Sequence, residues 1–129
     1  MACLETTFLI DVLRGDPKVK EFIASLTQSS EKMVAAPSVM ELWSGALLSN
    51  RSEEEKEKII ALLESLTVLP FDEKAAKEAG EIESNLIKKG EMIDIEDIMI
   101  GATAIVHGEK LITRDKHYAR IERLKMEKY

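Results

Sequence analysis

Short apolar segments alternate with helical segments along this chain, and no other feature of the sequence restricts the possible folds as strongly. The apolar, strand-like segments are 2–5, 32–36, 67–71 and 110–113, with a further short one at 124–127. Between them, apolar residues recur at helical spacing in segments 8–14, 18–27, 38–47, 52–66, 72–89 and 94–107. Strands that alternate with helices predict a three-layer α/β fold: a parallel sheet of four to five strands with helices on both faces.

Side chains that favour helix starts precede several of the predicted helices. Thr6 or Thr7 can cap the first helix, and residues 52–55 have the spacing of a capping box. Asp72 and Asp94 stand directly before the helices that follow them. We therefore expect these residues to satisfy the free backbone N–H groups at the helix starts.

The composition fits one domain over residues 1–129. The chain is 45% hydrophobic, which allows a real core, but no apolar run is long enough to span a bilayer. The first residues do not have the pattern of a signal peptide. Cys3 is the only cysteine, so no internal disulfide can form, and a cytoplasmic protein is expected.

The net charge of −6 argues against tight, nonspecific binding to duplex DNA. It does not exclude nucleic acid as a substrate. A few carboxylates gathered around a cation lower the formal charge without making the rest of the surface repel phosphates.

Four carboxylates stand where a parallel sheet would bring them to one edge. Glu5 ends the first predicted strand, and Asp115 follows the fourth. Glu41 lies in the helix just after the second strand, and Asp97 in the helix just before the fourth. In open α/β sheets the site lies beyond the carboxyl ends of the strands, so we expect these four side chains to meet there.

Carboxylates brought together repel one another. Two charges ~4 Å apart cost on the order of 4 kcal/mol at an effective dielectric constant of ~20. Protons, basic side chains or a hard divalent cation can offset this cost. Mg²⁺ and Mn²⁺ prefer oxygen ligands, whereas the imidazoles and thiolates that zinc prefers are too few here.

Each acid also has a purely structural interpretation. Glu41 could be the third residue of a Ser38 capping box, and Asp97 could stand in the same relation to Asp94. Asp115 could cap the turn after it. The joint placement of the acids at one sheet edge is what favours a site over these separate roles.

Four segments of the chain resemble a known family. They are 4–14, 37–42, 97–104 and 111–118, in the family's order and over nearly the whole chain. Together they resemble the PIN domain, and specifically the small VapC-type toxin ribonucleases of prokaryotic toxin–antitoxin pairs.

The resemblance implies an activity and a set of site residues. The activity is Mg²⁺- or Mn²⁺-dependent cleavage of single-stranded or loop RNA by a metal-activated water. Glu5, Glu41, Asp97 and Asp115 would be the catalytic and metal-binding acids. Thr113 would be their hydroxyl neighbour, with Thr7 where such proteins often have Asn or Ser.

The resemblance also implies partners. It predicts a homodimer and a cognate VapB-like antitoxin whose C-terminal segment blocks the site. Arg14, Lys116 and Arg120 are candidate contacts to RNA phosphates, although scattered surface charge is the simpler interpretation.

Glu5 departs from the pattern of the family, whose first acid is normally Asp. The charge is kept, but the side chain is longer by one methylene. Because Mg²⁺ tolerates little error in its octahedron, we expect reduced activity and an increase when Asp is restored at position 5.

Two other functions fit parts of the sequence. A catalytically inactive module could keep the fold and lose the metal. A phosphoacceptor signalling domain also has a parallel sheet and acids at strand ends, with Asp72 as the acceptor. The paired acids that such a domain needs after its first strand are absent, because only Glu5 stands there.

Overall fold

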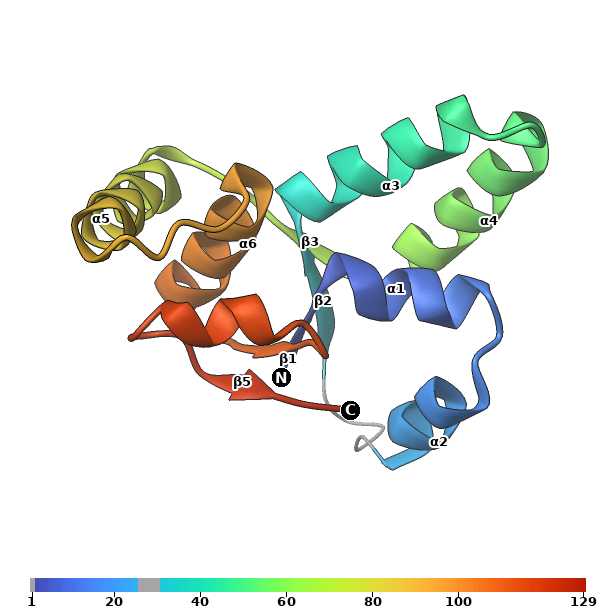
Figure 1. The fold of residues 1–129 in the computed structure, drawn as a ribbon. Helices are drawn as coiled ribbons and strands as arrows, with labels where there is room; N and C mark the ends of the chain where they lie inside the picture. The colour runs from blue at the N-terminus through green and yellow to red at the C-terminus, as the bar shows by residue number, and fades with distance from the viewer. Residues whose placement is uncertain (1, 26–30) are drawn as a thin grey trace.

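A five-stranded parallel sheet forms the centre of the part of the chain described by the computed structural model, residues 2–25 and 31–129. The strand order is β3-β2-β1-β4-β5, and every neighbouring pair is parallel. The strands are β1 (Ala2–Leu4), β2 (Lys32–Ala35), β3 (Thr67–Leu69), β4 (Lys110–Ile112) and β5 (Met126–Glu127). The predicted fold class is therefore confirmed (Figure 1).

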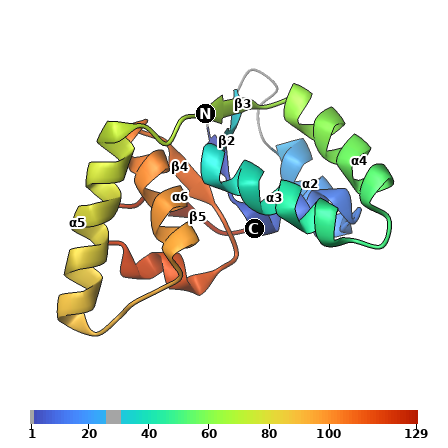
Figure 2. The same cartoon turned by 90° about the horizontal axis from the view of Figure 1, so that it is seen from above.

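Helices cover both faces of this sheet (Figure 2). On one face lie α5 (Glu73–Lys89) and α6 (Ile95–Val106), side by side in both views. On the other face lie α1 (Thr6–Leu13), α2 (Pro17–Ser25), α3 (Ala36–Leu48) and α4 (Ser52–Glu64). A short 3-10 helix, η1 (Lys116–Arg120), follows β4.

Alternate strand residues divide between two cores, because successive side chains of a strand point to opposite faces. In β1, Cys3 lies in the core under α5 and α6, and Leu4 lies in the core under α1 to α4. In β4, Leu111 and Ile112 divide in the same way. All four are buried, which explains why the strands read as short continuous apolar runs.

The central position of β1 brings distant parts of the chain together. β1 pairs with β2 on one side and with β4 on the other. The Glu5 N–H extends the second pairing by donating to the carbonyl of Ile112. The residue after β1 and the residue after β4, Thr113, therefore lie side by side at the carboxyl edge of the sheet.

The cap of α1 differs from the prediction. Glu5, not Thr6 or Thr7, is the N-cap, and its carboxylate accepts a hydrogen bond from the Thr7 N–H. A glutamate can do this because the side chain folds back over the first turn. The two threonines are already inside the helix.

Two further helix starts also differ from the prediction. The helix after β2 begins at Ala36 rather than Ser38, because Pro37 needs no N–H partner in the first turn and so favours it. The predicted capping box at 52–55 is wrong. Ser52 is already helical, and Arg51 is the N-cap but makes no side-chain capping bond.

The other caps follow the prediction more closely. Asp72 accepts from the Ala75 N–H at 3.0 Å and caps α5 as predicted. Asp94 stands at the cap position of α6, but its side chain makes no capping bond. The predicted helix 18–27 is observed from Pro17 to Ser25, and its last two predicted residues lie outside the described part.

None of the helices in the described ranges is both long enough and apolar enough to cross a bilayer.

Candidate active site

Glu5 lies buried at the carboxyl end of β1, and protein donors reach both of its carboxylate oxygens. Oε1 accepts from the Thr113 hydroxyl at 2.6 Å, and Oε2 accepts from the Thr7 N–H at 2.7 Å. Thr113 in turn accepts from the Asp115 N–H at 3.0 Å. One buried hydroxyl therefore joins the end of β1 to the loop that carries Asp115.

Asp97 and Asp115 line the same pocket at this edge of the sheet. Asp97 lies in the first turn of α6 and accepts from the buried Tyr118 hydroxyl at 3.0 Å. Asp115 accepts from His117 twice, from the backbone N–H at 2.9 Å and the ring Nδ1 at 2.8 Å. The predicted capping role of Asp115 is thus confirmed, and the same side chain faces the pocket. Other residues lining this pocket are Met92, Ile93, Asp94 and Arg120.

Glu41 reaches the site from α3 through a separate hydrogen-bond network. Its carboxylate accepts from the Thr6 hydroxyl at 2.7 Å, and Thr6 Oγ1 lies 2.9 Å from the buried Ser38 hydroxyl. Since Thr6 has a single hydroxyl hydrogen, Ser38 supplies the hydrogen of the second bond. Glu41 is therefore no capping-box partner of Ser38. It lines a hollow between α1, α3 and α4, together with Arg14.

The four carboxylates influence one another electrostatically. Burial, together with the charges of Asp115, Glu5 and Glu41, raises the pKa of Asp97 to about 6, although the hydrogen bond from Tyr118 lowers it. Burial also raises the pKa of Glu5, more than its hydrogen bonds to Thr113 and Thr7 lower it. No lysine or arginine of the described part forms an ion pair with any of the four. The His117 ring lies 2.8 Å from Asp115, and the other three acids have no basic partner within the described residues.

The donor chemistry of this site fits a hard divalent cation, since it offers carboxylate and hydroxyl oxygens. The side chains are not arranged as a finished cage. Within residues 2–25 and 31–129, no three Asp, Glu, His or Cys side chains are placed so that they could hold a metal ion. Both oxygens of Glu5 are turned towards Thr7 and Thr113 instead. The metal role of the four acids stays a prediction.

Comparison with known proteins identifies the family. The model of the PIN domain matches residues 2–124. The chain belongs to the PIN-domain family. Ribonuclease VapC2 of Haemophilus influenzae is 31% identical over 128 residues, which are 98% of this PIN domain and 96% of the relative. The resemblance inferred from the sequence is confirmed.

Solved structures agree with this assignment. The DNA-bound VapBC complex from Salmonella typhimurium contains a chain that matches with a TM-score of 0.90 and 26% identity, over 99% of this PIN domain and 98% of that chain. VapBC-1 from nontypeable Haemophilus influenzae matches with a TM-score of 0.89 and 26% identity, over 98% and 96% of the two chains. The family and its VapC branch are therefore shown by sequence and by fold.

The predicted RNA contacts lie in two regions of the PIN domain, Arg14 at the end of α1 and both Lys116 and Arg120 on η1. Arg14 is exposed beside the hollow that Glu41 lines, and Lys116 is exposed on η1. Arg120 lies at the pocket of Asp97 and donates to the backbone carbonyls of Glu91 and Met92, at 3.4 and 3.1 Å.

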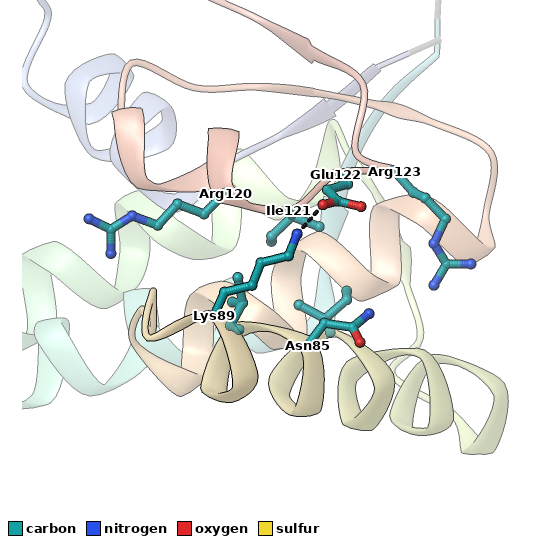
Figure 3. Close-up of a pocket in the computed structure, with 8 residues that line it drawn as sticks. Asn85, Lys89, Arg120, Ile121, Glu122 and Arg123 are labelled. Carbon is teal, nitrogen blue, oxygen red and sulfur yellow. Dashed lines mark hydrogen bonds and ion pairs between the residues drawn. The ribbon is translucent and has the colours of Figure 1, made fainter.

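A second crevice of the PIN domain lies between α5 and the segment after η1 (Figure 3). Arg120 points away from its centre, where Lys89 donates to Glu122. Arg123 on its other side pairs with Glu78 and with Glu81. Lys89 and Arg123 are thus already paired with carboxylates. This crevice is not part of the acidic site.

Sequence reasoning missed three residues that hold the acids. Thr6 and Ser38 orient Glu41, and Tyr118 orients Asp97. Tyr118 carried a signal, because it shares an apolar spacing with Ile121, and a buried tyrosine needs a partner for its hydroxyl. The sequence around Thr6 and Ser38 gave no signal for this role, because both residues fit a helix cap.

Proposed function

We propose that this PIN domain is an endoribonuclease of the VapC type, the toxin of a toxin–antitoxin pair, neutralised by a VapB-like antitoxin. Its relative from Haemophilus influenzae is named a ribonuclease, and two similar chains were solved within VapBC complexes. The observation that supports the activity most directly is that Asp97 and Asp115 line one pocket, with the buried Glu5 joined to the Asp115 backbone through Thr113, and the raised pKa of Asp97 agrees with this grouping. Such a concentration of negative charge is typical of a cation-dependent catalytic site.

The cation of the proposed enzyme is Mg²⁺ or Mn²⁺. Asp97, Asp115 and Glu5 would hold it, and Glu41 would hold a second ion or orient a water. When bound, the ion supplies activation of a water molecule and stabilisation of charge on the phosphodiester.

The remaining residues of the site hold these acids in place. The Tyr118 hydroxyl fixes one oxygen of Asp97, and Thr6 fixes one oxygen of Glu41. Thr113 connects Glu5 to the backbone of Asp115. No side chain of the site is an activated nucleophile, so hydrolysis without a covalent enzyme intermediate is the expected course.

RNA would approach across the pocket lined by Asp97 and Asp115. Arg120 lies at the wall of this pocket, and Lys116 lies on the same short helix. Arg14 would contact phosphates on the other side, near Glu41. The homodimer and the cytoplasmic location stay predictions.

The phosphoacceptor alternative has no support in the fold. Asp72 follows the edge strand β3, and its carboxylate caps α5. The inactive-module alternative is tested together with the proposal.

The test is cleavage of a labelled, structured RNA by the purified protein with Mg²⁺, with Mn²⁺ and with excess EDTA. Cleavage is expected only with metal. Asp97→Asn should lower the rate by more than about 100-fold, the size expected when a group that stabilises transition-state charge is lost. Asp16→Asn is the matched control, because Asp16 lies outside the site and its side chain accepts from the Lys18 N–H.

A folded protein that cuts no RNA and binds no Mn²⁺ would support the inactive module instead. Equal cleavage by wild type and Asp97→Asn would contradict the proposed site.

A further inference from the structure

A second buried carboxylate, Asp11 of α1, lies next to the proposed site but outside it. Its side chain is 8% exposed and bonds to Arg114, the residue between Thr113 and Asp115. Arg114 donates from Nε to Asp11 Oδ2 at 3.0 Å and from Nη2 to Oδ1 at 3.5 Å. The guanidinium therefore meets both oxygens of one carboxylate, a geometry that fixes orientation as well as charge.

Tyr129 completes this arrangement. Its hydroxyl donates to Asp11 Oδ2 at 2.7 Å. Its ring packs edge-on against Phe8 of α1, with centroids 4.7 Å apart, and lies 6.0 Å from the ring of Phe22. We call Asp11, Arg114 and Tyr129 the Asp11 cluster. It is anchored in the core on the side of α1.

The charge of Arg114 is already used within the protein. Burial opposes ionisation of Asp11, but the hydrogen bonds from Arg114 and Tyr129 outweigh it, and the pKa of Asp11 is lowered. The Arg114 side chain is 56% exposed, so it could be taken for a contact to an RNA phosphate. Its pairing with an ionised, buried carboxylate argues for a structural connection instead.

The position of Arg114 in the loop gives this connection its effect. Thr113, directly before it, donates to Glu5, and Asp115, directly after it, faces the pocket of Asp97. Fixing the side chain between them restricts the backbone on both sides. The two bonds that depend on this backbone are Asp115 N–H to Thr113 Oγ1 and His117 N–H to Asp115 Oδ1.

We propose that Asp11 is a positioning residue, which holds the loop of Thr113 and Asp115 in its active arrangement by binding Arg114. Its effect on catalysis rests on the proposed ribonuclease function, whereas its effect on the loop does not. The competing role, Arg114 as a direct contact to an RNA phosphate, predicts a different result in the same experiment.

The experiment compares Asp11→Asn, Arg114→Gln and the double variant in two measurements. The first is hydrogen exchange of the Asp115 and His117 amides in the metal-free protein. Both amides should exchange about fivefold faster or more in each single variant, while amides of α5 stay unchanged, because only the loop is released.

The second measurement is RNA cleavage. The kcat should fall by about 10- to 100-fold, the usual effect of losing a group that orients a ligand of the site. The KM for RNA should stay the same. The double variant should be no worse than either single variant, since both remove the same interaction.

Asp16→Asn is the matched charge control and should change neither measurement. If Asp11→Asn does not fold, Arg114→Gln carries the test, because it removes the same interaction at an exposed side chain and leaves Asp11 itself in place.

Wild-type exchange rates at Asp115 and His117 in these variants would overturn the proposal. A raised KM with unchanged kcat would also overturn it, in favour of the phosphate contact. If the wild-type protein cuts no RNA, the ribonuclease function fails, but the exchange rates still decide the role of Asp11.

Discussion

At the level of single residues, Glu5 shows how a proposed catalytic position and a structural position coincide. Its carboxylate caps α1 through Thr7 and accepts from Thr113, so both oxygens have partners inside the protein. Glu5 is not among the residues that line the pocket of Asp97 and Asp115.

The first residue-level prediction is that Glu5→Asp raises the rate of RNA cleavage by about tenfold, or about 1.4 kcal/mol in activation free energy. Aspartate restores the side-chain length usual in the family, and Mg²⁺ demands accurate placement of its ligands. Initial rates at saturating Mg²⁺ measure the effect. Glu5→Gln, which keeps the length and removes the charge, is the control and should be inactive. An unchanged rate in Glu5→Asp would contradict this account of position 5.

The second residue-level prediction concerns pH. The pKa of Asp97 is raised to about 6, mainly by burial, whereas an unfolded aspartate titrates near ~3.9. Because the pKa of Asp97 is higher in the folded protein than in the unfolded chain, protonation of Asp97 adds to the free energy of unfolding. This contribution is fully present below the unfolded pKa and is lost as the pH rises through about 6. Asp97→Asn, which can still accept from Tyr118, should therefore gain about 1–2 kcal/mol relative to wild type between pH 4 and pH 7.5, after allowing for solvent screening.

Urea unfolding in EDTA at the two pH values measures this difference. The metal must be absent, because a bound cation would stabilise the charged form of Asp97 and mask the effect. The same difference between variant and wild type at both pH values would mean that Asp97 titrates normally.

At the level of elements, the helix caps test how well local sequence determines local structure. Asp72→Ala removes the bond to the Ala75 N–H and should destabilise the protein by about 1 kcal/mol. Ser52→Ala is the matched control. Ser52 has the sequence pattern of a cap but lies inside α4, so its removal should have almost no effect. The urea midpoints of the two variants measure these losses of stability. Equal losses in Asp72→Ala and Ser52→Ala would show that the assigned caps are wrong.

The strands and helices were predictable because their signals are local. β1, β2 and β4 appear as short buried runs, and α5 shows both its cap and the Gly90 that ends it at positive φ. The errors are of one or two residues and have local causes, such as Pro37 entering the first turn of α3.

At the level of the whole molecule, the approximate place of the site could be predicted, and its internal connections could not. Parallel topology alone put Glu5 and Asp115 at one edge of the sheet. The bond between Asp11 and Arg114 spans 103 positions and that between Thr6 and Glu41 spans 35. No spacing within a helix or strand encodes such pairs, because they depend on how the layers pack.

The central place of β1 has a consequence for the synthesis of this protein. The first strand cannot complete its pairing until β4 has been made, and Glu5 meets Thr113 across 108 positions. At ordinary rates of translation the ribosome needs about 5–20 s to add that many residues. Throughout this interval the nascent chain holds its first acid without the partners that would form the site. The proposed nuclease would therefore be inactive beside the RNA of its own ribosome until the late strands emerge.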